Sequence, residues 1–265
     1  MPPDQPLSVL GSTALAVAAC RATESTRIDA WFHDELAQHV LAAAVAAAGA
    51  GVGAEPALSR GLVRWVAVRT RFLDELVDRA VADGVRQVVI VGAGLDARAF
   101  RLELPRDLTV FEIDHAEVIA FKQRMLDEHE FMSTCRRRVV VADLVTDDWL
   151  QRLIDSGWTP SQPTVWVAEG LLVYLNHQER TRLLTQLAAA SLLGSVLGAT
   201  LSTRTDNLAH PLWHPATTAD PQRWLAECGW RATVHTMAEA SAAYGRPLPP
   251  PFDTSTKGRL VRAVH

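Results

Sequence analysis

The chain has 265 residues, of which 48% are hydrophobic and 21% are charged; this composition is typical of a globular protein with a sizeable core. A formal net charge of −4 argues against a nucleic-acid partner, because such proteins usually carry a basic surface. The cysteines Cys20, Cys135 and Cys228 lie far apart, so they predict neither a disulfide framework nor a metal-ligand cluster.

The first apolar segments predict neither export nor a membrane span. Residues 17–20 read VAAC, like a lipoprotein cleavage site, but Asp4 precedes them and no Lys or Arg does, so the basic region of a signal peptide is missing. The stretch 41–54 is too short and too rich in Ala and Gly to cross a bilayer. We therefore expect a cytoplasmic protein without a membrane partner.

Helical patterns dominate the first 84 residues. Residues 12–46 are predicted to be helical, and the Gly-rich stretch 49–53 ends that pattern. Residues 57–82 form a second amphipathic pattern that Asp83-Gly84 terminates. We predict that residues 1–84 form an N-terminal helical cap.

Short apolar strands alternate with helical segments over residues 85–265, which predicts a mostly parallel α/β sheet. The expected strands are 87–91, 108–113, 138–142, 164–168, 195–201, 230–236 and 259–264. The expected helices are 115–129, 146–155, 177–191 and 221–228. Only the Pro-rich loop 245–252 separates the last two strands, which is too short for a crossover helix, so we expect an antiparallel pair at one edge.

A glycine turn, Gly92-Ala93-Gly94, follows the first predicted strand. Glycine permits a ligand to approach the backbone closely. With Ala97, the turn satisfies the relaxed G-x-G-x-x-A dinucleotide fingerprint, a pattern that several nucleotide-binding families share. The turn alone therefore leaves the ligand open.

Carboxylates follow each of the next three strands, where an open α/β sheet binds its ligand. Glu112 and Asp114 come about twenty residues after the turn, at the position of a ribose-binding acid, although Asp114 could also cap the next helix. Asp143, with Leu144, could contact an adenine or simply form a turn. Glu169 follows the buried strand 164–168 and could face an ammonium group.

Three acids around a glycine turn suit a ligand with a ribose, an adenine amino group and a positive centre, and suit a pyrophosphate poorly. This favours S-adenosylmethionine over NAD. The methionine carboxylate of that cofactor would require a cation, for which Arg21, Arg69 and Arg71 are candidates.

Several motifs resemble the bacterial branch of the leucine carboxyl methyltransferase family, which consists of class I S-adenosylmethionine-dependent O-methyltransferases. The motifs are ACRATESTRID, VRTRFLDELV, VGAGLDARAFRL, FEIDHAEVIAFK, VVADL, PTVWVAEGLLVYL, DPQRWLAECGW and YGRPLP. They cover most of the chain in order. The family usually has GLDTR where this chain has Ala97 in place of Thr, which puts one turn hydrogen bond in doubt.

The resemblance implies a class I methyltransferase Rossmann-like sheet with an N-terminal helical cap, and it implies a role for each matching residue. Arg21 and Arg69 would hold the methionine carboxylate, and Glu169 would lie near the amino group of the cofactor. Gly92 and Gly94 would contact the methionine portion. Asp114 would bind the ribose, and Asp143 and Leu144 would contact the adenine; Glu112 is a further ribose candidate from its place after the second strand alone.

The substrate is expected to be a small molecule. A carboxylate acceptor is ionised at neutral pH and needs positioning but no general base, whereas a hydroxyl acceptor of a natural product would benefit from one. Candidate bases are Tyr174, His210 and His214; the two histidines lack acidic or thiolate neighbours, so no metal site is expected. Residues around 202–220 are predicted to form a substrate-binding insertion, and nothing indicates the oligomeric state.

Two other functions stay open. An NAD(P)-dependent oxidoreductase would explain the fingerprint, but the two tyrosines and two lysines are not paired at short spacing. A non-catalytic cofactor-binding regulator would explain the fold, although acids are retained after all three strands.

Overall fold

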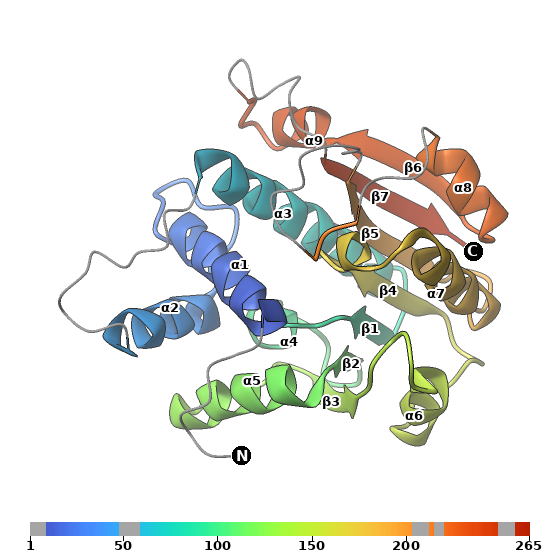
Figure 1. Ribbon diagram of the computed structural model, residues 1–265, viewed down its shortest axis with the longest axis horizontal. Helices are drawn as coiled ribbons and strands as arrows, with labels where there is room; N and C mark the ends of the chain where they lie inside the picture. Colours follow the sequence, from blue (N-terminus) through green and yellow to red (C-terminus); the bar gives the residue numbers. More distant parts are fainter. Residues whose placement is uncertain (1–8, 48–58, 203–211, 215–219, 249–257) are drawn as a thin grey trace.

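The computed structural model describes residues 9–47, 59–202, 212–214, 220–248 and 258–265 (Figure 1). The helices of the first part are α1 (Val9–Ser25), α2 (Glu35–Ala47), α3 (Arg60–Ala82), α4 (Arg98–Arg101) and α5 (Ala116–Glu128). The later helices are α6 (Trp149–Asp155), the 3₁₀ helix η1 (Leu172–Tyr174), α7 (His177–Ala189), α8 (Pro221–Glu227) and α9 (Met237–Ala243). No helix in these ranges is long and apolar enough to cross a membrane.

The described strands form one seven-stranded sheet in the order β3-β2-β1-β4-β5-β7-β6. Their bounds are β1 (Gln87–Val91), β2 (Thr109–Asp114), β3 (Arg136–Val141), β4 (Thr164–Ala168), β5 (Val196–Ser202), β6 (Arg231–Thr236) and β7 (Gly258–Val264). Strands β1 to β5 are parallel, and β7 runs antiparallel to both β5 and β6. The predicted mostly parallel sheet with an antiparallel pair at one edge is confirmed, with β7 as the reversed strand and β6 outermost.

Both faces of the sheet are covered, which explains why β1 and β4 consist of buried residues throughout. On one face, Val89 and Trp166 pack with residues of α6, α7 and α8. On the other face, Val88 and Ile90 pack against α3 and α4, and Leu73 of α3 belongs to the same cluster. The sheet is therefore the middle layer of three, as Figure 1 shows.

Helices α1 and α2 pack against each other, and α1 also contacts α3 while α2 contacts α5. In Figure 1 this pair lies to one side of the sheet, near α4 and α5. Helix α3 contacts β4, β5 and β7 as well as α1. The predicted boundary between cap and core at residue 84 therefore lies just after α3, a helix that packs against both α1 and the sheet.

One predicted helix is wrong, because residues 12–46 form two helices rather than one. The break spans residues 26–34. Asp34 starts α2 by accepting a hydrogen bond from the Ala37 N–H at 2.8 Å, and Glu24 accepts the Trp31 N–H at 2.9 Å. Acidic side chains thus satisfy backbone donors that a continuous helix would have used internally.

A second difference is α9, which lies between β6 and β7 where no helix was expected. Thr236 and Glu239 form a reciprocal capping box at its start. The T-x-x-E spacing was readable in the sequence. The helix does not alter the antiparallel pairing of β6 with β7.

Candidate functional site

The carboxyl ends of β1, β2, β3 and β4 lie along one edge of the sheet, because these strands are parallel neighbours. The chain runs outward from β1 through β2 to β3 and then returns to β4 on the other side of β1. Such a switch in strand order is where open α/β sheets bind ligands. We call this the cofactor edge; it comprises Gly92–Gly94, Asp114, Asp143–Leu144 and Glu169.

The glycine turn needs glycine at both of its ends. Gly92 has φ +68° and Gly94 has φ +51°, in the left-handed region that L side chains disfavour. A Cβ on Gly92 would lie 2.9 Å from Cδ1 of Leu171. The N–H groups of Gly92 and Ala93 both donate to the Ile113 carbonyl, at 2.9 and 3.0 Å, so the turn is fixed to the end of β2.

Asp114 stands at the end of β2 and is only partly buried. Its Oδ2 accepts the Gly94 N–H at 2.6 Å, and its Oδ1 accepts the His115 N–H at 2.7 Å. Burial raises the pKa of this carboxyl above its ordinary value, against the lowering effect of the two N–H donors. The carboxylate thus joins the glycine turn to β2, and it does so with both oxygens at the cofactor edge.

Glu112 precedes Asp114 by two residues, but its carboxylate lies between Lys122 and Arg137. Its Oε2 is 2.8 Å from Lys122 Nζ and 2.8 Å from an Arg137 guanidinium nitrogen, and only 1% of the residue is exposed. Burial would raise the pKa of Glu112, but these two cations lower it below its ordinary value. The structure therefore places Glu112 in a buried ion cluster between β2, β3 and α5, which does not support its predicted contact with the cofactor.

Asp143 forms a turn with the chain that follows it. Its Oδ1 accepts the N–H groups of Val145 and Thr146 at 2.7 and 3.3 Å. Burial raises the pKa of the Asp143 carboxyl, but these N–H donors lower it by more. The pKa of Asp143 therefore lies below its ordinary value. Leu144 is half-buried against the core cluster that faces α6 and α7. Both residues stand at the cofactor edge, and their adenine contacts stay a prediction.

Glu169 is the centre of a cluster of ion pairs at this edge. Oε1 is 2.9 Å from Nε of Arg69, and Oε2 is 2.7 Å from Nη2 of Arg98. Burial alone would raise the pKa of Glu169, but Arg98, Arg69 and then Arg21 lower it to about 2. The carboxylate is therefore ionised at every physiological pH.

Arg98 is a residue of this site that the sequence patterns did not single out. It is 1% exposed and also pairs with Asp74 at 2.8 Å and with Asp96. Burial lowers the pKa of Arg98, and the three carboxylates raise it well above the ordinary value. Arg98 is the first residue of α4, which follows the glycine turn. The sequence indicated this arginine only through its position in the motif LDAR, which corresponds to LDTR in the family.

Arg21 joins the cap to the cofactor edge. Its Nε is 2.6 Å from Asp34 at the start of α2, and its Nη2 donates to the Leu95 carbonyl at 2.6 Å. Leu95 directly follows Gly94. The structure thus brings the predicted Arg21 and Arg69 to the same edge as the glycine turn and Glu169.

Of the three candidate bases, two can be placed. Tyr174 is half-buried in η1, five residues after Glu169. His214 is exposed, and its backbone N–H donates to the carbonyl of Val173 at 2.8 Å. Val173 directly precedes Tyr174 in the chain. His210 lies outside the described residues, as does most of the predicted insertion 202–220. Among the described residues, no group of three or more His, Cys, Asp or Glu side chains could hold a metal ion.

Comparison with known proteins shows the family of the chain. The family model for leucine carboxyl methyltransferase matches residues 14–188. The chain belongs to this family. A relative from Frankia alni is 41% identical over 96% of this chain and 94% of its own length, and one from Streptomyces avermitilis is 40% identical over the same shares. Both carry the name "putative S-adenosyl-L-methionine-dependent methyltransferase".

Solved structures agree on the fold. The family member resembles a "putative methyltransferase" from Thermobifida fusca with a TM-score of 0.56 at 16% identity, covering 92% of this chain and 93% of that one. It also resembles magnesium protoporphyrin IX methyltransferase from Synechocystis with bound SAM, with a TM-score of 0.51 at 15% identity, covering 78% and 84%. The predicted family, fold class and cofactor, S-adenosylmethionine, are confirmed by the comparisons.

Proposed function

We propose that this protein transfers the methyl group of S-adenosylmethionine to a carboxylate oxygen of a small organic acid. The observation that supports this is the meeting of a glycine turn, Asp114 and the Arg69–Glu169 pair at one sheet edge, in a chain of the leucine carboxyl methyltransferase family. Family membership supports a methyltransferase that uses S-adenosylmethionine. The carboxylate oxygen as acceptor and the small organic acid as substrate are our proposal.

The residues at this edge fit the cofactor. Gly92 and Gly94 have positive φ angles that favour glycine at both positions. Burial raises the pKa of Asp114, and hydrogen bonds from the ribose hydroxyls would stabilise its carboxylate. Arg69 would hold the methionine carboxylate with its two terminal nitrogens, which lie beside Gly170. Glu169 would then face the ammonium group, and Asp114 the ribose.

The bound cofactor supplies a sulfonium methyl group that is electrophilic at carbon. The chain needs to hold an oxygen nucleophile in line with it and to exclude water. A carboxylate is already ionised, so no residue has to accept a proton. Arg98 contributes by holding the Glu169 carboxylate in place through its 2.7 Å contact.

A hydroxyl acceptor is the second candidate, and one observation favours it. The backbone hydrogen bond from His214 to Val173 brings the His214 backbone close to that of Tyr174, five residues after Glu169 in the chain. A phenol or alcohol would benefit from a histidine or tyrosine that acts as a base. The two candidates therefore differ in whether the Tyr174 and His214 side chains affect the rate.

Calorimetric titration with S-adenosylmethionine, S-adenosylhomocysteine and NAD tests the cofactor, and binding of NAD alone would overturn the proposal. Transfer of a labelled methyl group is then measured across pairs of acids and the corresponding alcohols and phenols. We expect products that release labelled methanol on mild alkaline hydrolysis, as methyl esters do. A product stable to alkali would be an ether and would support the second candidate.

A further inference from the structure

Within the described part of the chain, the Glu169 carboxylate accepts three hydrogen bonds. Oε1 accepts from Arg69 Nε at 2.9 Å and from the Thr70 hydroxyl at 3.3 Å, and Oε2 accepts from Arg98 Nη2 at 2.7 Å. A carboxylate has about four lone-pair positions, so about one remains for a further donor. In the proposed function, that donor is the ammonium group of the cofactor.

The guanidinium group of Arg98 is bound by a different carboxylate at each of its three nitrogens. Nε donates to Asp74 at 2.8 Å, Nη1 donates to Asp96, and Nη2 donates to Glu169 at 2.7 Å. Because the guanidinium is planar and rigid, these three contacts fix its orientation. They also fix the position of the Glu169 oxygen that it binds.

Asp74 of α3 holds Arg98 and Arg101 together. Its Oδ1 accepts from Arg98 Nε at 2.8 Å and from Arg101 Nη2 at 2.6 Å, and its Oδ2 accepts from Arg101 Nη1 at 2.6 Å. The Asp74 side chain is only 3% exposed. Asp74 lies one helical turn after Thr70, so one face of α3 contacts both Glu169 and the arginine that orients it.

Ion pairs connect these groups into one network, which we call the arginine–carboxylate network. Within the described ranges of the chain it consists of three arginines and three carboxylates, namely Arg69, Arg98, Arg101, Asp74, Asp96 and Glu169. Each of these side chains is at most 11% exposed. The network is neutral overall, as is the amino-acid end of the cofactor, which carries one ammonium and one carboxylate.

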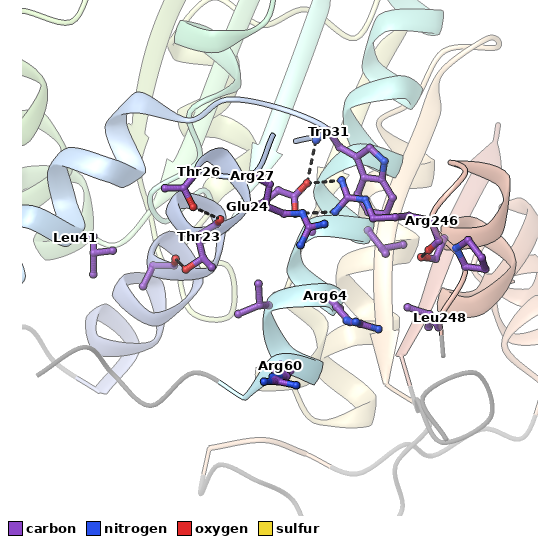
Figure 2. Close-up of a pocket in the computed structure, with 16 residues that line it drawn as sticks. Thr23, Glu24, Thr26, Arg27, Trp31, Leu41, Arg60, Arg64, Arg246 and Leu248 are labelled. Atoms are coloured by element: carbon purple, nitrogen blue, oxygen red, sulfur yellow. Dashed lines mark hydrogen bonds and ion pairs between the residues drawn. The ribbon is translucent and has the colours of Figure 1, made fainter. Parts of the chain in front are cut away.

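The charges of this network are balanced within the network itself. Nearer its start, α3 lines a cavity of about 750 Å³ together with α1 and the chain that follows α9 (Figure 2). None of the six network residues is among the described residues that line this cavity. Loss of one carboxylate would therefore leave a buried excess of positive charge, and such a charge acts strongly on its neighbours because little water screens it.

We propose that Asp74 is a positioning residue that makes the cofactor edge selective for the zwitterionic amino-acid end of S-adenosylmethionine. It acts through Arg98: by compensating Arg98 and Arg101, it leaves the negative charge of Glu169 to the ammonium group. This rests on the proposed function, which places that ammonium group at Glu169. Without the Asp74 charge, one excess cation beside Glu169 would repel an ammonium group but not a carboxylate.

S-Adenosylhomocysteine and its deaminated analogue, in which hydrogen replaces the amino group, are matched probes of this selectivity. Each is titrated calorimetrically into the full chain, and the ratio of their affinities measures the contribution of the amino group. In Asp74→Asn, we expect the affinity for S-adenosylhomocysteine to fall about 10-fold or more, and the affinity for the analogue to change less than about 3-fold. A general loss of packing would lower both affinities together.

A double variant tests the role of charge balance directly. Asp74→Asn/Arg101→Gln removes one charge of each sign and makes the network neutral again. Its affinity ratio should return to within about 3-fold of the wild-type ratio. If Asp74→Asn does not fold, Arg101→Gln alone tests the inference, because it leaves one carboxylate in excess and should raise the ratio.

Asp83→Asn is the matched control, since it removes the same charge from an exposed position at the end of α3; its ratio should equal that of the wild type. The inference is overturned if the ratio in Asp74→Asn, or in Arg101→Gln where that variant replaces it, equals the wild-type ratio. A wild type that binds both probes equally would overturn the placement of the ammonium group at Glu169. Failure of S-adenosylhomocysteine to bind the wild type would count against the proposed function itself, and the inference would fall with it.

Discussion

Asp114 connects two parts of the cofactor edge, because its two oxygens accept the N–H groups of Gly94 and His115. In the proposed site, the same carboxylate also accepts hydrogen bonds from the ribose. Hydrogen bonds to a charged group contribute about 1.5–3 kcal/mol each. Loss of two of them is therefore expected to weaken binding about 100-fold or more.

We therefore predict that Asp114→Ala lowers the affinity for S-adenosylhomocysteine about 100-fold, measured by calorimetry. Asp107→Ala is the control, because Asp107 is 66% exposed just before the opposite end of β2 and pairs with Arg86 at 3.2 Å. It should bind normally. Unchanged affinity in the folded Asp114 variant would refute the ribose assignment.

Glu169 makes the stability of the protein depend on pH in a defined direction. Its pKa in the fold is about 2, below the ordinary value of 4.5. The ionised carboxylate therefore stabilises the fold above pH 4.5, and this contribution is lost as the pH falls toward 2. The shift corresponds to about 3 kcal/mol as an upper bound.

We predict that Glu169→Gln lowers the free energy of unfolding at pH 7 by about 3 kcal/mol, because it leaves Arg98 and Arg69 without their shared carboxylate. Urea unfolding from pH 7 to pH 3 should show the gap to the wild type narrowing below pH 4.5. Glu227→Gln, which removes an exposed carboxylate of α8, should leave the profile unchanged. A gap that is constant with pH would contradict the account.

Between elements, α3 packs closely on the sheet at Gly198 of β5. A Cβ on Gly198 of β5 would lie 2.6 Å from Cδ2 of Leu73 and 3.1 Å from Cδ1 of Leu76. The glycine thus lets the helix approach the strand. Overpacking at such a contact typically costs about 1–3 kcal/mol.

We predict that Gly198→Ala destabilises the protein by about 1–3 kcal/mol in urea unfolding. Leu73→Ala opens a space at the same contact, and by itself should cost about 2–5 kcal/mol. In the Leu73→Ala background, Gly198→Ala should therefore cost less than it does in the wild type. Additive effects in this double-mutant cycle would show that the contact does not determine the cost.

The elements most accurately predicted from sequence are those with strong local patterns. The buried strands β1 and β4 match their predicted bounds, because continuous apolar runs bounded by polar residues specify a strand buried on both faces. The break between α1 and α2 was missed, since it depends on Asp34 and Glu24, whose side chains bind backbone donors only in the folded chain.

For the site, the strand-end rule located Asp114, Asp143 and Glu169 at one edge, but it could not separate Glu112 from Asp114. Both lie on the same face of β2, and only the fold shows that Lys122 and Arg137 surround the first of them. The Arg98 pairs with Asp74 and Glu169 likewise join residues 24 and 71 positions apart. Local patterns carry no information on contacts of that range.

At the scale of the whole molecule, two contacts connect the helical cap to the rest of the chain on different sides. Arg21 joins α1 and α2 to the turn after β1 through Asp34 and the Leu95 carbonyl. Glu24 joins the end of α1 to Arg246, beyond α9. The cap thus contacts both the turn that follows β1 and the chain that precedes β7.

Because Arg21 serves both the cap and the proposed methionine carboxylate, its replacement should affect order and binding together. We predict that Arg21→Met increases amide hydrogen exchange in α1 and α2 while β1 and β4 stay protected, and that it lowers the affinity for S-adenosylhomocysteine at least 10-fold. In the wild type, adding S-adenosylhomocysteine should slow exchange in the cap. Arg223→Met, which removes an arginine of α8 that is 78% exposed, should change neither readout. If Arg21→Met loosens the cap but binds S-adenosylhomocysteine normally, Arg21 is a packing residue and the methionine carboxylate is held without it.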